Sequence, residues 1–546
     1  MNKTLLSLML TASLAASSTV QAETAPSTEK WQPRIDFEGK LGNERSLGEA
    51  DLLVPLWQSN DSLLFANLRG RMDNDDSYEG NIGVGLRHML NNGWNLGGYG
   101  YFDRRKSPYD NFFNQVTLGF EALSMDWDLR ANAYIPVGKT SYFEESLGTA
   151  DFSGTTITYR AGEERSMSGY DAEIGWRIPV FSLEDDKQLR VYAGGYRFTD
   201  SQADTIQGPR ARLEMKFNAL PFLSRSSRLS LGLEYQHDDP RGSQRFAMLR
   251  LSIPLGGTKA KTSRALTAME QRMTDPVVRD VDVVSQGGSY GAPEVIRETA
   301  DGKRIVLFDN NVNASNFSTA IANAGDNATV ILNGDYTGVN TLAIVQPGQQ
   351  ILGAANLRVK TPSGRSVNIT TPSASISGSG SNGGLGGGKR FFDMADNSSL
   401  IGIDAKITSS SSAKIVQIEG KENVNILNNT FTTVSDSEST ASGLAIDNSR
   451  NVSIRNNTIN IIANGGNGQA TAFIGNNANI DFSNNTLNMG GTSSVSRWYT
   501  YFFAGSVTVN NLSGTGNTSN HVKCHFNNSF YTVTGSIETN GNISCP

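Results

Sequence analysis

The chain has 546 residues, of which 38% are hydrophobic and 18% are charged, and its formal net charge is −6. This acidic balance, without a long basic block, argues against a nucleic-acid-binding protein. No interior segment reaches the roughly 18 consecutive apolar residues that a membrane-spanning helix requires, which excludes a helical membrane protein. Charged residues are concentrated before residue 290, so the two parts of the chain differ in composition.

The N-terminus has the features of a targeting segment. Lys3 supplies a positive charge, residues 5–16 are mostly apolar, and a small-residue cleavage site ends at Ala22. This order predicts a secretory signal peptide over 1–22, followed by a short periplasmic N-terminus over 23–30. An amphipathic N-terminal helix is the alternative. Export would expose the two cysteines, both near the C-terminus, to an oxidising compartment.

Residues 31–258 alternate between apolar and polar side chains. In 210–218 (RARLEMKFN), alanine, leucine, methionine and phenylalanine alternate with four charged residues. Successive side chains of a strand point to opposite faces, so each segment forms one apolar and one polar wall. We predict strands with residues such as Leu213 facing lipid and Arg212 facing a lumen. A soluble sandwich is the alternative.

Three features favour a membrane barrel over a sandwich. The segments run for about 9 to 13 residues, aromatic residues recur near their ends, and short connections alternate with longer ones, as in outer-membrane barrels. Twelve strands are predicted, and an even number closes the barrel with both ends on the periplasmic side. The predicted strands start near Arg34, Glu49, Leu63, Gly80, Trp94, Asn114, Trp127, Tyr170, Gln188, Pro209, Arg228 and Gln244.

The segment 259–289 is predicted to hold a plug helix and a linker. Thr262 or Ser263 is expected to cap the helix, and the residue before Pro276 ends it because that position disfavours helical geometry. Residues 277–284 are expected to be extended and to lead outward through the lumen. An ordinary interdomain linker is the alternative. The residues assigned to the plug and linker are Ala265, Leu266, Met269, Met273, Pro276 and Arg279.

Five stretches carry a resemblance to a known family: 52–56 (LLVPL), 81–87 (NIGVGLR), 98–103 (GYGYFD), 133–136 (AYIP) and 272–280 (RMTDPVVRD). They resemble the intimin–invasin family, the inverse autotransporters of type Ve secretion, over just under half of the chain. The resemblance implies a twelve-stranded outer-membrane barrel, a lumenal helix and a C-terminal passenger displayed outside the cell. We expect a monomeric barrel whose partners are outer-membrane lipid, periplasmic chaperones and the barrel-assembly machinery. Larger members carry a periplasmic peptidoglycan-binding module, for which the expected N-terminus leaves no room.

Residues 290–546 contain an internal repeat. The segment 423–431 (NVNILNNTF) recurs at 451–459 (NVSIRNNTI) and 478–487 (ANIDFSNNTL), and the Asn-Asn-Thr triplets are 28 residues apart. This period, with short β-branched runs, predicts stacked coils whose corner asparagines form side-chain ladders and adopt left-handed backbone. We predict a parallel β-helix passenger, and therefore an all-β chain. A hairpin-built sandwich is the remaining alternative, since leucine is too scarce for leucine-rich repeats.

Carboxylate chemistry has little support in this passenger. The closest acidic pair, Asp436 and Glu438, lies in a serine-rich segment typical of a solvated turn. Asp404, Asp447 and Asp481 have spacings that do not fit the 28-residue repeat, so they are not expected to line one cleft as glycoside hydrolysis requires. No catalytic residue and no cofactor are predicted.

The two cysteines allow two interpretations. Cys524 and Cys545 are residue types that bind zinc together with His521 and His525. In an exported domain a disulfide between the cysteines is favoured. A bridge that closes a loop of about 20 residues removes about 3 kcal/mol of unfolded-state freedom, and it would pin the terminal coil.

The sequence therefore predicts an outer-membrane protein that displays its own passenger at the cell surface. We expect an adhesin- or invasin-like binding protein, associated with virulence, whose ligand is an unknown host or bacterial surface molecule. A translocator or docking platform for a separately encoded exported protein is the alternative. A surface polysaccharide-degrading enzyme is a weaker one, because the fold alone does not fix the function.

Overall fold

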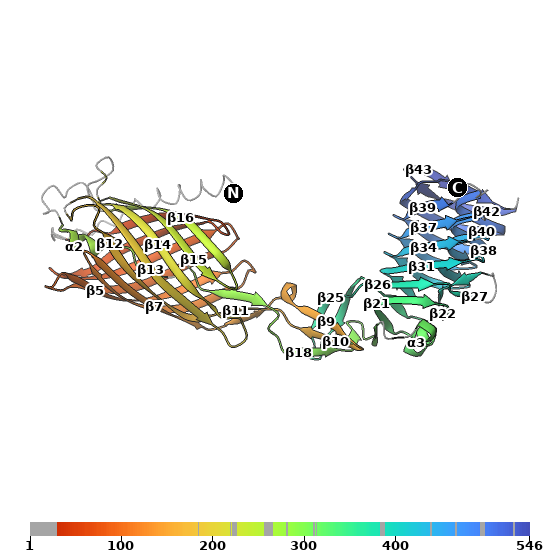
Figure 1. Ribbon diagram of the computed structural model, residues 1–546, viewed down its shortest axis with the longest axis horizontal. Coiled ribbons are helices and arrows are strands. Elements are labelled where there is room, and N and C mark those ends of the chain that lie inside the picture. The colour runs from red at the N-terminus through yellow and green to blue at the C-terminus, as the bar shows by residue number, and fades with distance from the viewer. Residues whose placement is uncertain are drawn as a thin grey trace. The chain divides into compact units, whose positions relative to one another are not determined.

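The computed structural model describes residues 30–183, 185–218, 220, 227–255, 266–279, 282–309, 312, 314–382, 388–436, 439–464, 467–491, 497–527 and 530–545. Contacts divide the chain into two units, Met1–Leu147 with Gly162–Gly291, and Gly148–Ala161 with Ala292–Pro546. Figure 1 shows a barrel in the first unit and stacked coils in the second. Within the described ranges, no helix has the length and apolar character needed to cross a membrane.

Twelve antiparallel strands of the described chain close into a barrel. The first strand, β1 (Arg34–Gly42), pairs with β2 (Leu47–Gln58) on one side and with β16 (Gly242–Pro254) on the other, so no strand edge stays open. This confirms the predicted barrel, and each strand begins close to its predicted start. The other strands are β3 (Ser62–Asp73), β4 (Tyr78–Met89), β5 (Trp94–Lys106), β6 (Phe112–Ser124), β7 (Trp127–Val137), β12 (Ser168–Ile178), β13 (Lys187–Thr199), β14 (Ile206–Phe217) and β15 (Arg228–Asp238).

The barrel wall has an apolar outer face and a polar inner face. Leu213 is 40% exposed, whereas its neighbour Arg212 is 9% exposed and pairs with Glu173 across the inner wall. Trp127 and Trp176 lie near strand ends with their ring centroids 6.4 Å apart, as expected at a membrane interface. Further exposed apolar side chains on the barrel strands include Leu68, Ile82, Val84, Leu86, Phe102, Leu118, Phe120, Ile174, Leu231 and Leu233.

The long connection between β7 and β12 contains four short strands. β8 (Ser141–Phe143) and β11 (Glu163–Ser166) pair with each other, and β11 also pairs with β17 (Ser285–Gly288) in the barrel unit. β9 (Thr149–Ser153) and β10 (Thr156–Arg160) form a hairpin that belongs to the second unit. The predicted barrel region, 31–258, therefore includes a segment, Gly148–Ala161, that belongs to the second unit.

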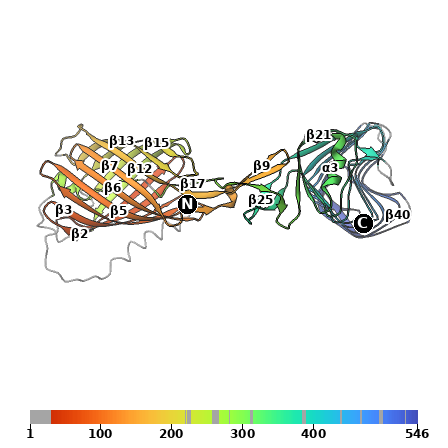
Figure 2. The ribbon, with the colours of Figure 1, turned by 90° about the horizontal axis from the view of Figure 1, so that it is seen from below.

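The second unit is a parallel β-solenoid, which confirms the predicted β-helix. Strands of one coil pair in parallel with those of the next, for example β33 (Glu422–Leu427) with β36 (Arg450–Arg455). Figure 2 shows α3 (Phe317–Ala324) beside the coils, where its apolar residues Phe317 and Ile321 join the solenoid core.

The remaining strands of the second unit follow in chain order. At its base lie β18 (Pro293–Ile296), β19 (Glu298–Thr299), β24 (Asn356–Lys360) and β25 (Ser366–Thr370). The short strands β27 (Ser381–Asn382) and β28 (Lys389–Arg390) form a separate pair, and short 3-10 helices lie at Glu145–Leu147 and Ala314–Asn316. The coils contain β20 (Ile305–Asp309), β21 (Thr329–Val339), β22 (Ala343–Ile344), β23 (Gln350–Leu352), β26 (Ala374–Gly378), β29 (Phe392–Asp393), β30 (Ser399–Ile401), β31 (Ile403–Ser409), β32 (Val416–Glu419), β34 (Thr430–Ser435), β35 (Ala441–Asp447), β37 (Thr458–Ala463), β38 (Asn467–Ser483), β39 (Thr486–Gly491), β40 (Arg497–Ser519), β41 (Cys524–Phe526), β42 (Tyr531–Thr539) and β43 (Asn542–Cys545).

The asparagine triplets form the corners of these coils, with a different role for each asparagine. The first, as in Asn456, adopts left-handed backbone with φ of 58°. The second is buried, and Asn429 donates from Nδ2 to Oδ1 of Asn457, which donates in the same way to Asn485, each over 3.0 Å. A buried polar group left without a partner costs about 1–3 kcal/mol, so this ladder holds the coils in register. The predicted ladder is confirmed.

The two faces of the barrel wall predict opposite effects of charge. Leu213→Arg is expected to destabilise the barrel by about 2–4 kcal/mol if the residue lies near the bilayer midplane, because the charge would face lipid. Arg212→Ser should leave assembly nearly intact, since Glu173 keeps Arg130 as a partner at 3.2 Å. Heat-modifiable gel migration of the membrane fraction measures assembly. Loss of the folded band in Arg212→Ser, with a normal band in Leu213→Arg, would invert the assigned faces.

Candidate functional site

The lumen of the barrel contains the segment that follows the last strand. It begins with a short helix, α2 (Ala268–Arg272), whose N-terminus is closed by a capping box: Thr267 accepts from the backbone N–H of Glu270, and the Glu270 carboxylate accepts from the backbone N–H of Thr267. Thr267 itself is extended, with φ −62° and ψ 161°, so the predicted helix through Leu266 is wrong at its start. The longer helix was predicted from apolar spacing, but the capping box fixes a later start.

Some predicted positions lie outside the described residues. These are the expected cleavage site at Ala22, the expected caps Thr262 and Ser263, and the plug residue Ala265. The remaining plug residues are described, and the contacts that follow define where they lie.

The helix is bound at one end of the barrel. Trp31 donates from its indole nitrogen to the carbonyl of Glu270 over 2.7 Å, and Asn95 at the start of β5 donates to the carbonyl of Met269 over 3.1 Å. Met273 is fully buried in a small apolar cluster with Trp31 and Phe65. Leu266 packs against the edge of this cluster. Apolar burial therefore anchors the helix where β5 begins.

Charged wall residues hold the turn after the helix. Arg272 pairs with Asp128 over 2.6 Å, and Arg228 pairs with Asp275 over 2.9 Å. Arg87 donates to the carbonyls of Met273 and Asp275 over 2.9 and 2.7 Å. These contacts satisfy the backbone carbonyls that the end of the helix leaves open, ahead of Pro276.

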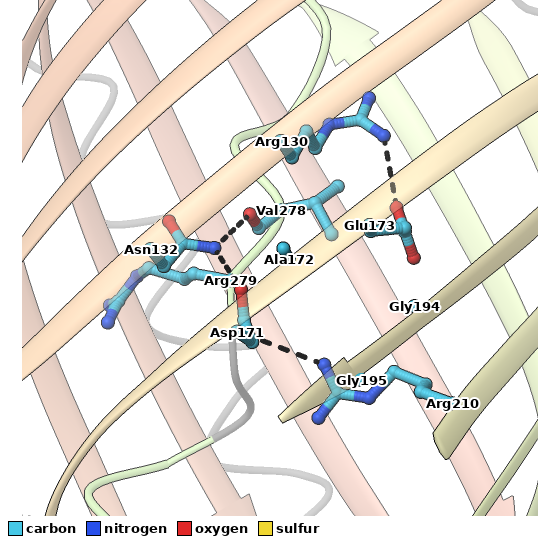
Figure 3. A pocket seen from close by; sticks show the side chains of 10 residues that line it. All are labelled: Arg130, Asn132, Asp171, Ala172, Glu173, Gly194, Gly195, Arg210, Val278 and Arg279. Atoms are coloured by element: carbon cyan, nitrogen blue, oxygen red, sulfur yellow. Dashed lines mark hydrogen bonds and ion pairs between the residues drawn. The ribbon is translucent and has the colours of Figure 1, made fainter. Parts of the chain in front are cut away.

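The middle of the segment crosses the lumen in non-helical conformation. Figure 3 shows Val278 with its carbonyl beside Asn132, which donates to it over 3.3 Å. Arg279 pairs with Asp103 over 2.9 Å and lies over the ring of Tyr101 at 4.5 Å. Two cavities between this segment and the wall measure about 10 and about 40 Å³. The smaller has room for about one water molecule, so the segment fills the lumen at this level.

The far end of the segment is bound where β5 finishes. Asp282 pairs with Arg45 over 2.7 Å and with Arg71 over 2.8 Å. Val283 donates its backbone N–H to Glu79 over 2.8 Å and accepts from Arg105 over 2.6 Å. β5 extends from Trp94 to Lys106, so the segment is bound near both ends of this barrel strand. The segment thus runs the length of the barrel.

Comparison with known proteins identifies the family. A family model described as the beta-domain of inverse autotransporters matches residues 5–281. The chain belongs to the inverse autotransporter family. The barrel accordingly lies in the outer membrane, and the passenger is exposed at the cell surface.

Several solved structures are similar to this chain. A chain from a study of in-meso crystallization of membrane proteins is 15% identical, covering 47% of this chain and 100% of its own length, with a TM-score of 0.34. The translocator domain of autotransporter NalP from Neisseria meningitidis is 10% identical. The match covers 46% of this chain and 95% of that domain, with a TM-score of 0.24. KdgM porin in complex with disordered oligogalacturonate is 9% identical. The match covers 41% of this chain and 99% of the porin chain, with a TM-score of 0.25. No curated protein matches the chain.

The wall residues that bind the plug were not identified from the sequence. Arg87, Asp103 and Asp128 are lumen-facing members of strands with alternating polarity, and this alternation was the available indication of their direction. Their partners on the plug follow only from the three-dimensional register. Other lumenal charges pair within the wall, for example Lys216 with Glu214 at 3.7 Å.

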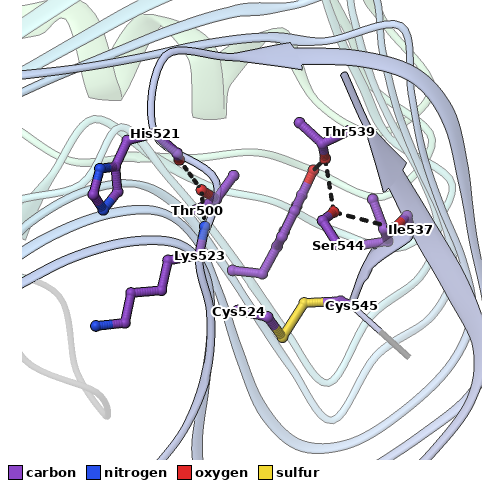
Figure 4. The surroundings of a disulfide bond; sticks show 9 residues. Thr500, His521, Lys523, Cys524, Ile537, Thr539, Ser544 and Cys545 are labelled. Carbon is purple, nitrogen blue, oxygen red and sulfur yellow. Dashed lines mark hydrogen bonds between the residues drawn. A yellow bond between two sulfur atoms is a disulfide. The ribbon is translucent and has the colours of Figure 1, made fainter. Parts of the chain in front are cut away.

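The passenger ends in a disulfide-linked coil. Cys524 in β41 and Cys545 in β43 are joined by a disulfide, with their Cα atoms 5.6 Å apart (Figure 4). Beside it, Tyr501 lies 2.9 Å from the hydroxyl of Thr539, which lies 2.9 Å from that of Ser544. Because the cysteines are bonded to each other, they supply no thiolate for the alternative zinc site. His525 instead stacks on the ring of Tyr499 at 4.4 Å.

A largely buried polar cluster spans neighbouring coils, with Arg390 1% and Lys414 8% exposed. Arg390 pairs with Asp393, and Lys414 donates to Gln417 over 2.8 Å. Burial lowers the pKa of Lys414 to about 8. Asp447 lies beside Glu419 in register, and burial raises its pKa.

In the described pairings of the coils, Asp404 and Asp481 have no acidic residue opposite them. Asp404 is paired with Thr430, and Asp481 with Ser453. The sequence analysis did not compare Glu419 with Asp447, although the two residues are 28 apart and share the spacing of the triplets.

Reversing one charge of the plug should open the lumen. Arg279→Glu faces Asp103 with like charge, and breaking a buried pair in this way costs about 3–5 kcal/mol. We expect a larger and longer-lived single-channel conductance in planar bilayers than for the unaltered protein. The matched control is Arg279→Glu with Asp103→Arg, which restores opposite charges and should close the channel again. Unchanged conductance in the single variant would show that the segment does not seal the pore.

Removing the disulfide should weaken the last coil without preventing display. Cys524→Ser with Cys545→Ser is expected to lower passenger stability by up to about 3 kcal/mol, because the unfolded chain gains freedom. Limited proteolysis of displayed protein, with fragments mapped by mass, should give the first cuts near β41. Reductant-treated unaltered protein should reproduce this pattern. Digestion that starts at the Tyr290 end would contradict the assigned role of a terminal cap.

Proposed function

We propose that this inverse autotransporter exports its own solenoid and presents it as an adhesin- or invasin-like binding protein. The observation that carries the proposal is continuity of the chain: the segment bound along the lumen from Met273 to Val283 leads directly into β17 and then into the solenoid. A chain that remains in the pore after export would anchor its passenger covalently at the cell surface.

The proposal assigns a role to each part of the chain. Residues 1–22 direct export, with cleavage after Ala22, and 23–30 remain in the periplasm. The barrel of 31–258 and the plug and linker of 259–289 form the anchor, and 290–546 form the passenger. Periplasmic chaperones and the barrel-assembly machinery would deliver the barrel as a monomer to the lipid.

The solenoid surface supports binding rather than catalysis as its role. Exposed asparagines stack from coil to coil, with Asn451 donating to Asn423 over 3.2 Å and Asn479 donating to Asn451 over 2.8 Å. Such ladders present amide groups at a regular spacing set by the strand separation of about 4.8 Å. A polar array of this kind suits an extended partner on a host or bacterial surface, whose identity the proposal leaves open.

Two measurements test display and binding separately. Antibody against the solenoid should label intact cells that make the full chain, and those cells should adhere more strongly to a host-cell or bacterial layer than cells whose chain ends after Gly291. Labelling only after the outer membrane is permeabilised would overturn display. Labelling without any gain in adhesion, together with surface retention of a second exported protein, would favour the docking-platform alternative.

A further inference from the structure

We propose that the hairpin β9–β10, which the barrel sequence contributes between β7 and β12, is the template on which the exported passenger begins to fold. The inference rests on the proposed self-display and concerns how that display is completed. It assigns a function to a surface loop: an exposed strand edge that accepts the first passenger strand, β18, by β-augmentation.

The pairing of this hairpin is regular. β10 pairs antiparallel with β18, and the facing residues include Ile157 with Ile296 and Thr158 with Val295. The opposite edge of β10 is covered by β9, to which a tight turn with Gly154 at φ +56° connects it. The hairpin is therefore local in sequence and can form without the passenger, whereas the edge facing β18 stays open until the passenger arrives.

The buried side chains of the hairpin complete an apolar cluster at the base of the passenger. Ile157 and Tyr159 are 2% and 1% exposed, although both come from the loop of the barrel. They pack with Ile296 of the first passenger strand. The other members of this cluster are Ala161, Leu307, Ile331, Leu352, Leu357, Val359, Val367 and Ile369. The passenger base thus lacks part of its core until the hairpin joins it.

The contacts continue from the template into the first coils. Glu294 of β18 accepts from the backbone N–H and the hydroxyl of Ser363, over 2.7 and 3.0 Å, in the turn that joins β24 to β25. Glu298 of β19 then pairs with Lys360 of β24. A series of antiparallel pairings therefore links the barrel loop to the hairpin β24–β25, whose residues Val359 and Val367 pack beside Leu307 of the coils.

A template solves a specific difficulty of solenoid folding. Each coil buries its apolar face only against a neighbour, so the first coil to form has the least support. Parallel pairing also connects residues distant in sequence, and the chain entropy must be lost before contacts form. A hairpin that has already formed removes this step for the first passenger strands. Folding would then proceed from β18 toward the disulfide-linked coil.

A matched pair of double variants tests the template in the full chain on cells. Ile157→Asp with Tyr159→Asp places charge on the buried face of β10, whereas Thr156→Asp with Thr158→Asp places the same charge on its opposite face. In a pulse-chase, the first double variant should acquire a protease-resistant surface passenger several-fold more slowly than the unaltered protein, and the second at a nearly normal rate. Heat-modifiable migration of the barrel should be normal in both.

A normal rate of maturation in the first double variant would overturn the template, even if its final passenger were less stable. A second measurement follows the order of folding without disturbing the buried face. Thr158→Cys with Val295→Cys, in a chain with Cys524→Ser and Cys545→Ser, should form its cross-strand disulfide before the last coils resist protease. The reverse order would contradict the proposal. Failure of self-display is distinct, because the unaltered passenger would then be absent from the surface.

Discussion

A buried charge requires a partner, and this constraint determines the structure of the anchor. Successive side chains of the barrel strands alternate in direction, so arginine and carboxylate side chains line the lumen. The plug excludes most of the water from this lumen. Removing one partner of such a pair leaves an uncompensated charge at a cost of several kcal/mol. Arg279 meets Asp103, and Asp282 meets Arg45 and Arg71. The exported chain is thus itself part of the folded barrel, and its position along the lumen is set by these pairs.

The same requirement holds for the polar backbone of the passenger. Each coil leaves strand edges that only the next coil can pair, and buried asparagines such as Asn457 complete the corners by bonding to the coils on both sides. The first and last coils each have strand edges without a neighbouring coil, so other groups must cover these edges. The disulfide between Cys524 and Cys545 closes one end, while at the base the barrel loop supplies Ile157 and Tyr159. In both the anchor and the passenger, a segment distant in sequence supplies the partners that buried groups and strand edges require.

The sequence predicted the parts of this structure that depend on local periodicity. The twelve barrel strands and the direction of Leu213 and Arg212 follow from a period of two, and the coils follow from recurring Asn-Asn-Thr triplets. The start of the plug helix was wrong because apolar spacing around Leu266 competed with the capping box formed by Thr267. Partners of the plug such as Asp128, and the membership of β10 in the passenger, depend on pairing between distant segments. A single sequence gives no register for such pairs.

The segment from Met273 to Val283 lies in the lumen, and it should remain threaded through the barrel in the mature protein. Cross-linking tests it most directly, with cysteines replacing Arg279 in the plug and Asp103 in the wall and a short bismaleimide bridging them in intact cells. We expect an internal cross-link in chains whose passenger is already at the surface, identified by mass as one peptide pair. The same reagent should not join position 279 to a cysteine at Leu118 on the outer face. Surface-displayed chains that yield no cross-link between positions 279 and 103 would contradict the account.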